Sequence, residues 1–281
     1  MTSASGRLAT RLRRQRAAQR AGDATRWFVA GMVQGATELL PVSSSAHTAL
    51  ARRLLRLTNR RVPEQRSGRA AEVAAHAGSL LALLVCGRLR RPRDTTAVLL
   101  TLGPPVVAAT LFRRWLTQAA RDGRTTACAQ ACSALLLLAA AQRSPRAGAG
   151  STRRRRRYEA LSGLAQTLAL IPGVSRSGAI TAAVMLAGGD RRLASELVDE
   201  TTGPVLAAAV VREALTVALS PVRRELATPL AACALGAGTA TALSAQFLPR
   251  ELEHPALRRL AIYRLLLAAL QGRLAMPRGG P

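Results

Sequence analysis

Two short segments hold most of the residues that could perform chemistry. The first, VQGATELLPVSSSAH (residues 33–47), sets the carboxylate of Glu38, three serines and the imidazole of His47 within an apolar run. The second, LIPGVSRSGA (residues 170–179), sets the guanidinium of Arg176 between two serines, shortly after a Pro-Gly pair. A carboxylate, hydroxyl groups, an imidazole and a guanidinium are together the parts of a site that transfers a phosphoryl group.

The expected roles follow from the chemistry of each group. The planar guanidinium of Arg176 suits bidentate recognition of a phosphate, and the flanking Gly173 and Gly178 let backbone N–H groups approach the same anion. Glu38 follows Gln34 by one helical turn, so both side chains could offer oxygens to one divalent cation. Structural alternatives exist as well: Arg176 could extend to a helix end, and Glu38 could simply pair with it.

The sequence does not determine which group attacks phosphorus. Ser44 lies three residues before His47, so on a helix the two side chains face the same way. Ser44 is the preferred nucleophile, with His47 accepting its proton; alternatively, His47 activates water or attacks phosphorus itself. The three serines could also cap the helix that follows, and His47 could be a hydrogen-bonded packing residue.

The two segments are similar to each other. LLPVSSSAH and LIPGVSRSG align Pro41 with Pro172 and Ser44 with Ser175, and both interrupt an apolar run. Proline ends a helix and glycine allows unusual backbone angles. A pair of interrupted apolar segments at matching positions of two halves is typical of inverted repeats. Because irregular backbone at membrane depth must line a cavity or be buried, we expect two re-entrant hairpins that meet tip to tip.

The rest of the chain supplies apolar runs that could form membrane helices, at roughly residues 27–50, 70–87, 95–112, 126–142, 161–188, 203–219, 227–248 and 258–272. A membrane span needs about 20 mostly apolar residues, and terminal Arg side chains that reach the interface relax this length. Aromatic residues make up only 2% of the chain, so the apolar residues are small or aliphatic, as suits close helix packing in lipid. A soluble helical bundle is the alternative.

The predicted fold is all-α: a polytopic membrane helical bundle with two inverted repeats, each containing a re-entrant helical hairpin. Residues 27–272 are expected to form a single membrane-embedded catalytic domain, with repeat halves at roughly 27–142 and 158–272. Residues 1–26 are expected to be a basic, disordered N-terminal tail, and residues 273–281 a C-terminal tail.

The charge of the chain needs a separate explanation. All 41 basic Lys and Arg positions are Arg, and the formal net charge is +26, which would normally indicate nucleic acid. The Arg clusters, however, lie between apolar runs rather than on one continuous face, which favours loops flanking membrane helices. The four cysteines lie inside apolar runs without His or carboxylate partners, so packing rather than zinc binding is expected.

Taken together, these residues resemble a known family. VQGATELLPVSSSAH and IPGVSRSGA resemble the two signature segments of undecaprenyl-diphosphate phosphatase, the bacitracin-resistance family of bacterial membrane proteins. HAGSLLALLV (residues 76–85) and AIYRLLLAAL (residues 261–270) are similar to two further family segments. The resemblance implies hydrolysis of undecaprenyl diphosphate to undecaprenyl phosphate and inorganic phosphate, which recycles the lipid carrier for cell-wall synthesis. A second hypothesis is a lipid-phosphate carrier, or flippase, that uses the same inverted-repeat site.

The residue chemistry and the resemblance together assign the site. The residues expected to be catalytic are Glu38, Ser44, His47 and Arg176. Glu38, together with Gln34, is expected to bind the metal. The residues expected to bind the substrate are Gln34, Ser45, Gly173, Ser175, Ser177 and Gly178. The expected cofactor is a divalent cation (Mg or Ca) bound with the substrate diphosphate.

The expected partners are a polyprenyl diphosphate lipid and the bilayer, with no nucleic acid, and a homodimer is left open. The resemblance implies a multi-pass protein of the bacterial plasma (inner) membrane, with its active site on the extracytoplasmic side. One stretch departs from the family pattern. SELVDETTGPVLAA (residues 195–208) is more polar than the usual run, which puts the ordinary embedding of that helix in doubt.

Overall fold

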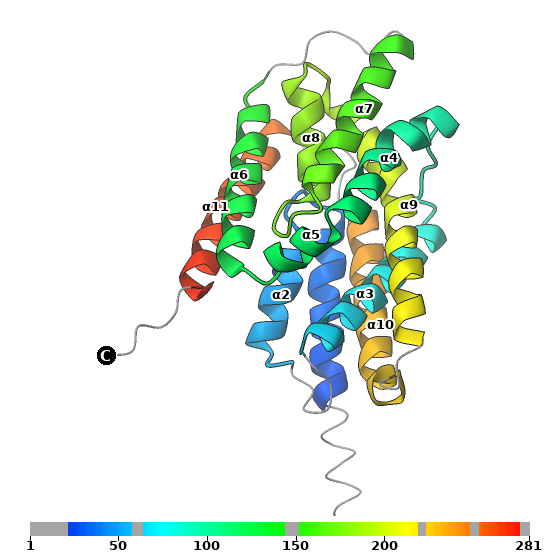
Figure 1. The fold of residues 1–281 in the computed structure, drawn as a ribbon, viewed down its shortest axis with the longest axis vertical. Helices are drawn as coiled ribbons and strands as arrows, with labels where there is room; N and C mark the ends of the chain where they lie inside the picture. The colour runs from blue at the N-terminus through cyan, green and yellow to red at the C-terminus, as the bar shows by residue number, and fades with distance from the viewer. Residues whose placement is uncertain (1–21, 58–63, 144–151, 219–222, 248–252, 276–281) are drawn as a thin grey trace, which may run out of the picture.

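The computed structural model describes residues 22–57, 64–143, 152–218, 223–247 and 253–275, and within these ranges every regular element is a helix (Figure 1). The predicted all-α class is therefore confirmed for this part of the chain. A first helix covers residues 22–38. It is followed by α2 (Ser44–Leu54), α3 (Glu64–Val85), α4 (Thr95–Leu111), α5 (Arg113–Ala119), α6 (Gly123–Ala140), α7 (Thr152–Leu168), α8 (Arg176–Leu186), α9 (Arg191–Ala218), α10 (Arg223–Phe247) and α11 (His254–Ala275).

The helices follow the predicted apolar runs, and they extend beyond them into polar sequence. Residues 22–26, which were predicted to belong to a tail, are helical, because their mostly exposed side chains can stay solvated while the backbone continues the turn. At the other end, α11 continues to Ala275, past the predicted end at residue 272. The rest of both predicted tails, residues 1–21 and 276–281, lies outside the described residues.

Two helical hairpins meet near the middle of the molecule. The first helix and α2 are joined by residues 39–43, which include Pro41, and α7 and α8 are joined by residues 169–175, which include Pro172. In Figure 1 the first hairpin enters from below and the second from above, and their loops come together. The hydroxyl of Ser177 donates a hydrogen bond of 3.0 Å to the carbonyl oxygen of Leu40, so the two loops are in direct contact.

The helices pack closely because small residues face one another. A Cβ atom on Gly31 would lie 2.0 Å from the carbonyl oxygen of Cys233, and one on Gly35 would lie 2.1 Å from that of Ala237. Only glycine fits at these two positions of the first helix, where it packs on α10. In addition, α3 lies against α10, α4 against α7, and α6 against α11. Such small-residue contacts between backbones are typical of helix association in membranes.

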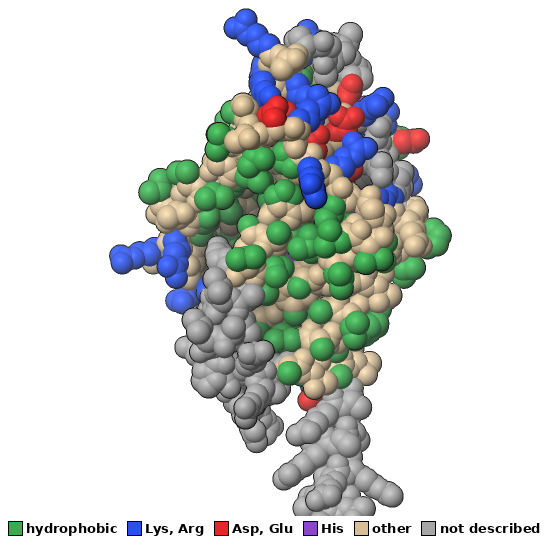
Figure 2. Space-filling view, turned by 90° about the vertical axis from the view of Figure 1, so that its right-hand side faces the viewer, with side chains coloured by type: hydrophobic (Ala, Val, Ile, Leu, Met, Phe, Trp, Pro, Cys, Tyr) green, Lys and Arg blue, Asp and Glu red, His purple; other side chains and the backbone are tan. Residues whose placement is uncertain are grey.

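The outer surface of the bundle agrees with a membrane environment. Two described helices are long and apolar enough to span a bilayer, at Ser67–Val85 and Ala227–Phe247, and α4 with α5 would make a third if this pair, bent by 82°, is one broken span. Large apolar side chains such as Leu81, Leu99 and Val106 are exposed. Figure 2 shows hydrophobic side chains spread over the middle of one face, with charged side chains gathered at its upper end.

The charged upper end explains the unusually polar stretch of α9. Arg155 of α7 is buried and contacts three carboxylates, at 3.3 Å from Glu159, 3.1 Å from Glu196 and 2.7 Å from Glu200. Asp199 lies 3.9 Å from Arg90, in the connection between α3 and α4. The acidic residues of this stretch are therefore paired with arginines, and such pairing is the usual condition for burying a charge.

Candidate functional site

The charged centre of the molecule is formed by one residue from each hairpin. Glu38 is the last residue of the first helix, and Arg176 is the first residue of α8. The Oε1 atom of Glu38 lies 3.8 Å from the Nη2 atom of Arg176, which is close enough for an ion pair but too long for a hydrogen bond. Both side chains are largely shielded from solvent, so the sequence-based expectation that these two residues meet is correct.

Each of the two charged groups keeps an atom without a partner. Arg176 donates through Nη2 to the hydroxyl of Thr202 at 3.1 Å, whereas its buried Nη1 has no hydrogen-bond acceptor. The buried Oε2 atom of Glu38 likewise accepts no hydrogen bond. Buried polar atoms are normally satisfied, so those that are not require an explanation.

The second loop presents Arg176 from a capped helix start. The side chain of Ser175 accepts a hydrogen bond of 3.2 Å from the backbone N–H of Gly178, and its oxygen lies 3.3 Å from that of Ser177. Gly173 adopts a φ of 97°, and a Cβ atom there would lie 2.3 Å from the carbonyl oxygen of Thr126. The loop therefore requires glycine at this position, both for its backbone angle and for its close contact with α6.

The first loop starts its helix differently. Ser43 is the N-cap residue of α2 with a φ of 70°, and its side chain makes no capping hydrogen bond. A non-glycine residue with a positive φ carries backbone strain of about 1–3 kcal/mol, and such residues are common at functional sites. Ser43 and Ser45 lie with their hydroxyl oxygens 3.3 Å apart. The half-buried hydroxyl of Ser44 makes no hydrogen bond to any described residue, which leaves it available as a nucleophile.

His47 is held at both of its ring nitrogens. Nδ1 lies 2.8 Å from the carbonyl oxygen of Ser43, which can only accept, so Nδ1 carries the proton. Nε2 of the neutral ring therefore accepts from the hydroxyl of Tyr263, at 2.6 Å. The two rings also stack, with centroids 5.5 Å apart. No hydrogen bond joins His47 to Ser44 among the described residues, so the proton transfer expected between them is not preformed.

The amide of Gln34 is also engaged within the first hairpin. It is buried, and its Oε1 atom accepts a hydrogen bond of 3.2 Å from the hydroxyl of Thr48, which also donates to the carbonyl oxygen of Ser44 at 2.9 Å. Gln34 thereby connects the first helix to the start of α2. An amide oxygen has two lone pairs, so Gln34 could accept this hydrogen bond and hold a cation at the same time.

Two site residues on α11 were missed by the sequence reasoning. Tyr263 contacts His47, and the neighbouring Arg264 is fully buried and donates to the Ser133 hydroxyl and, at 3.5 Å, to the carbonyl oxygen of Gly173. One turn of α11 thus contacts both hairpins, at α2 in the first and at the loop of the second. An arginine inside the apolar segment AIYRLLLAAL is itself a signal, since the same criterion singled out Arg176.

His76 was not assigned a site role from the sequence, and it lies close to the charged pair. Its Nε2 atom is 4.0 Å from the Oε2 atom of Glu38. No cluster of three or more His, Cys, Asp or Glu side chains suited to a metal ion occurs within the described ranges. The open Oε2 atom of Glu38 nevertheless fits a divalent cation, provided that most ligands are phosphate oxygens and water, as is usual for Mg²⁺.

These groups together can bind and activate a phosphorylated ligand. Arg176 and the start of α8 offer donors for phosphate oxygens, Glu38 offers one open carboxylate oxygen, Ser44 a free hydroxyl, and His47 a fixed imidazole. Between the two motifs, the structure brings Glu38 to Arg176 and Ser177 to Leu40. Ser45 is exposed on α2 and touches only Ser43 among the contacts described above.

Comparison with known proteins leads to one family. The bacitracin resistance protein BacA family matches residues 27–270. The undecaprenyl-diphosphatase of Maricaulis maris is 35% identical over 169 residues, which cover 53% of this chain and 60% of that protein. Two further undecaprenyl-diphosphatases match over nearly the whole length. That of Rubrobacter xylanophilus is 31% identical, and the match covers 88% of this chain and 96% of that protein. That of Hahella chejuensis is 29% identical, and the match covers 86% of this chain and 94% of that protein. The chain therefore belongs to the bacitracin resistance protein BacA family.

Proposed function

We propose that this protein hydrolyses undecaprenyl diphosphate to undecaprenyl phosphate and inorganic phosphate, the activity named for its relatives. The observation that carries the proposal is the buried pair of Glu38 and Arg176, where Oε2 of one and Nη1 of the other have no hydrogen-bond partner. A diphosphate supplies acceptor oxygens for the guanidinium. A divalent cation held by Glu38 would supply the partner for the carboxylate.

In the proposed reaction, Arg176 holds the terminal phosphate with help from the backbone N–H groups at the start of α8. The hydroxyl oxygen of Ser44 attacks the terminal phosphorus, the P–O bond to the inner phosphate breaks, and undecaprenyl phosphate leaves. The proton of Ser44 passes to Nε2 of His47, directly or through the hydroxyl of Tyr263. Water then hydrolyses the phosphoserine and releases inorganic phosphate. Attack by water activated by His47, or by His47 itself, uses the same positions.

Glu38 is the residue that would hold a divalent cation, Mg or Ca, together with oxygens of the diphosphate. When bound, such an ion offsets the charge that develops on the phosphate oxygens. Gln34, one turn earlier, supports the same face of the first helix. The Nε2 atom of His76 lies 4.0 Å from the Oε2 atom of Glu38, beyond hydrogen-bond distance, and adds a nearby polar group to this site.

We place the two hairpins as re-entrant segments of two inverted repeats. Support comes from their opposite directions in Figure 1, their matching Pro positions, and the contact between Ser177 and Leu40. We propose a plasma (inner) membrane location with the site open to the extracytoplasmic side, where the family's lipid substrate would be recycled. The carrier alternative finds no support among the relatives, each of which is named for a diphosphatase activity.

The direct test is phosphate release from undecaprenyl diphosphate by the full chain purified in detergent, with and without a chelator. We expect release by the wild type, loss with chelator, and recovery on addition of Mg²⁺ or Ca²⁺. Arg176→Gln should lower the rate by about two orders of magnitude or more, as is typical when a charge-stabilising donor is removed. The matched control is Arg192→Gln, because the side chain of Arg192 is 76% exposed and, among the residues that the structure describes, forms an ion pair with Glu196 alone. Equal rates for Arg176→Gln and the control would refute the proposal.

A further inference from the structure

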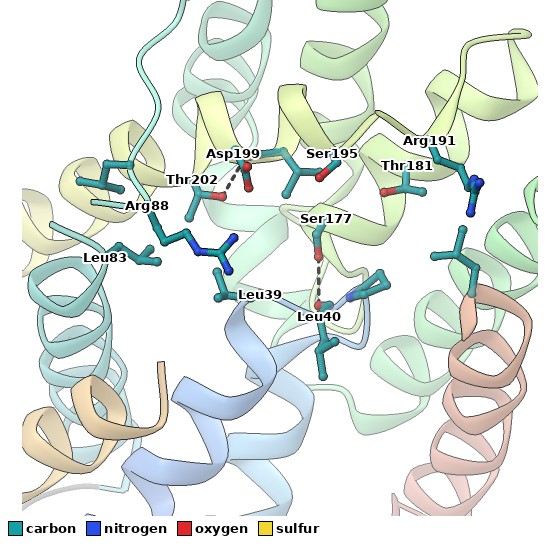
Figure 3. Close-up of a pocket in the computed structure, with 14 residues that line it drawn as sticks. Leu39, Leu40, Leu83, Arg88, Ser177, Thr181, Arg191, Ser195, Asp199 and Thr202 are labelled. Carbon is teal, nitrogen blue, oxygen red and sulfur yellow. Dashed lines mark hydrogen bonds between the residues drawn. The ribbon is translucent and has the colours of Figure 1, made fainter. Parts of the chain in front are cut away.

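A pocket opens beside the charged pair, between the connection that follows α3, the loop of the first hairpin, α8 and α9 (Figure 3). Its walls include the hydroxyls of Ser177, Ser195 and Thr202, and Figure 3 shows the guanidinium of Arg88 directed into it. We refer to it as the Arg88 pocket.

The Arg88 pocket directly adjoins the site of the proposed reaction. Thr202 lines the pocket and at the same time accepts the hydrogen bond from Nη2 of Arg176. Ser177, the residue after Arg176, also lines it and donates to Leu40 on the opposite hairpin. A ligand that fills the pocket would therefore lie next to a ligand held by Arg176.

The charges around the pocket favour an anion. Arg88 donates through Nη2 to the carbonyl oxygen of Ala245 and has other contacts, and its guanidinium carries a permanent positive charge that attracts an anion. The one carboxylate in the lining, Asp199, lies 3.9 Å from Arg90, which offsets its charge. The hydroxyls on α8 and α9 make the lining more polar, although Ser177 donates its proton to Leu40 and Thr202 donates its proton to the carbonyl oxygen of Val198.

Leucines make part of the pocket lining apolar. Leu39 and Leu40 come from the first hairpin, Leu83 from α3, and Leu89 from the connection that carries Arg88. The pocket therefore combines cationic and hydroxyl groups with aliphatic side chains. This combination matches a phosphate group that is attached to a hydrocarbon chain better than it matches a free phosphate ion.

We propose that the Arg88 pocket binds the inner, lipid-linked phosphate of the substrate together with the first part of its hydrocarbon chain. The proposal rests on the proposed function and assigns the two phosphates of the substrate to different residues. Arg176 and Glu38 hold the terminal phosphate, which is released, whereas Arg88 holds the phosphate that stays on the lipid. The same pocket would then bind the lipid monophosphate product.

The test measures the binding of two probes, farnesyl phosphate and inorganic phosphate, to the purified full chain in detergent, alongside hydrolysis of undecaprenyl diphosphate. Arg88→Gln should weaken farnesyl phosphate binding and raise KM by about tenfold or more, as expected for the loss of a charge-assisted hydrogen bond, while inorganic phosphate binding stays unchanged. The matched control is Arg91→Gln, because Arg91 is exposed in the same connection and does not line the pocket.

A second variant tests whether Arg88→Gln weakens binding only because it removes the contact between Arg88 and Ala245. Ser195→Asp adds a negative charge to the pocket wall without removing Arg88, and it should also weaken farnesyl phosphate binding. Unchanged farnesyl phosphate binding in both variants would overturn the proposal, and so would a weakening confined to inorganic phosphate. If the wild type binds farnesyl phosphate through Arg88 but releases no phosphate from the diphosphate, the pocket stands and the proposed function fails.

Discussion

The Oε1 atom of Glu38 lies 3.8 Å from the Nη2 atom of Arg176, across the contact between two hairpin loops that are far apart in the sequence. Neither group satisfies the other completely, because one oxygen and one nitrogen remain without hydrogen bonds. If the pair served stability alone, we would expect both atoms to be hydrogen-bonded, since a buried charge without a partner is costly. The geometry therefore favours a pair that is completed by a ligand.

Variants that remove Glu38 and Arg176 singly and together can separate a role in stability from a role in ligand binding. Glu38→Ala and Arg176→Ala should each destabilise the protein by up to about 3–5 kcal/mol, because each leaves an uncompensated buried charge. The double variant should recover part of that stability and none of the phosphate release. Thermal unfolding in detergent and the hydrolysis assay are measured on the same samples. Activity that returns along with stability would show that the pair is structural.

The hydrogen bond from Tyr263 to His47 gives a second prediction. Tyr263→Phe removes the hydroxyl that fixes Nε2 and keeps the stacked ring. We expect kcat to fall by about tenfold, and His47→Ala to lower it by about two to four orders of magnitude, the range typical of a lost general base.

A double variant checks whether Tyr263 acts through His47. The rate of His47→Ala with Tyr263→Phe should equal that of His47→Ala alone, since there is no imidazole left to position. Independent, additive losses would contradict this arrangement and assign Tyr263 a role of its own.

The backbone of the second loop gives a prediction about stability. Gly173→Ala introduces a Cβ atom 2.3 Å from the carbonyl oxygen of Thr126 at a residue with a φ of 97°. We expect a loss of more than about 1 kcal/mol, together with reduced activity because Arg176 follows three residues later. Gly103→Ala is the matched control, since nothing lies within 4 Å of a Cβ atom there, and it should be neutral or slightly stabilising. Circular dichroism melting curves of both variants provide the comparison.

Much of the site could be predicted because its residues lie in two compact motifs. Glu38, Ser44 and His47 share one interrupted run, and the Pro-Gly pair before Arg176 marks the second. Proline and glycine act locally, so helix breaks at these positions follow from the sequence alone. The matching break positions were enough to predict that Glu38 and Arg176 would meet.

The remaining site residues depend on packing between distant helices. Thr202 becomes relevant only because α9 crosses the start of α8, and Tyr263 only because α11 lies beside α2. Nothing in the local pattern of either helix separates these residues from their neighbours. The sequence also did not show which residues pair with Glu196, Glu200 and Asp199, because Arg155 and Arg90 come from other elements. The polarity of α9 therefore cast doubt on its ordinary embedding in the membrane. The ion pairs account for that polarity.

The start of α4 gives a prediction about pH. A hydrogen bond from Arg156, together with the backbone N–H of Ala97, holds the pKa of the exposed Asp94 below its ordinary value of 3.8. A lowered pKa in the folded state stabilises the protein above the unfolded value, and this contribution is lost as pH falls through the folded pKa. Asp94→Asn should therefore lower the melting temperature slightly at pH 7 and make no difference at pH 2. A gap that persists at pH 2 would show that the effect is not electrostatic.

The cluster around Arg155 gives the last prediction. Its guanidinium lies within 3.3 Å of Glu159, Glu196 and Glu200, so Arg155→Ala would leave three carboxylates close together, two of them buried. We expect a loss of stability of about 3–5 kcal/mol, whereas Arg157→Ala, at an exposed position of the same helix, should change it by less than about 0.5 kcal/mol. Adding Glu200→Gln to Arg155→Ala should restore part of the loss, because one unpaired charge is removed. If unfolding curves in detergent show the same stability for the Arg155 and Arg157 variants, the cluster does not hold α7 against α9.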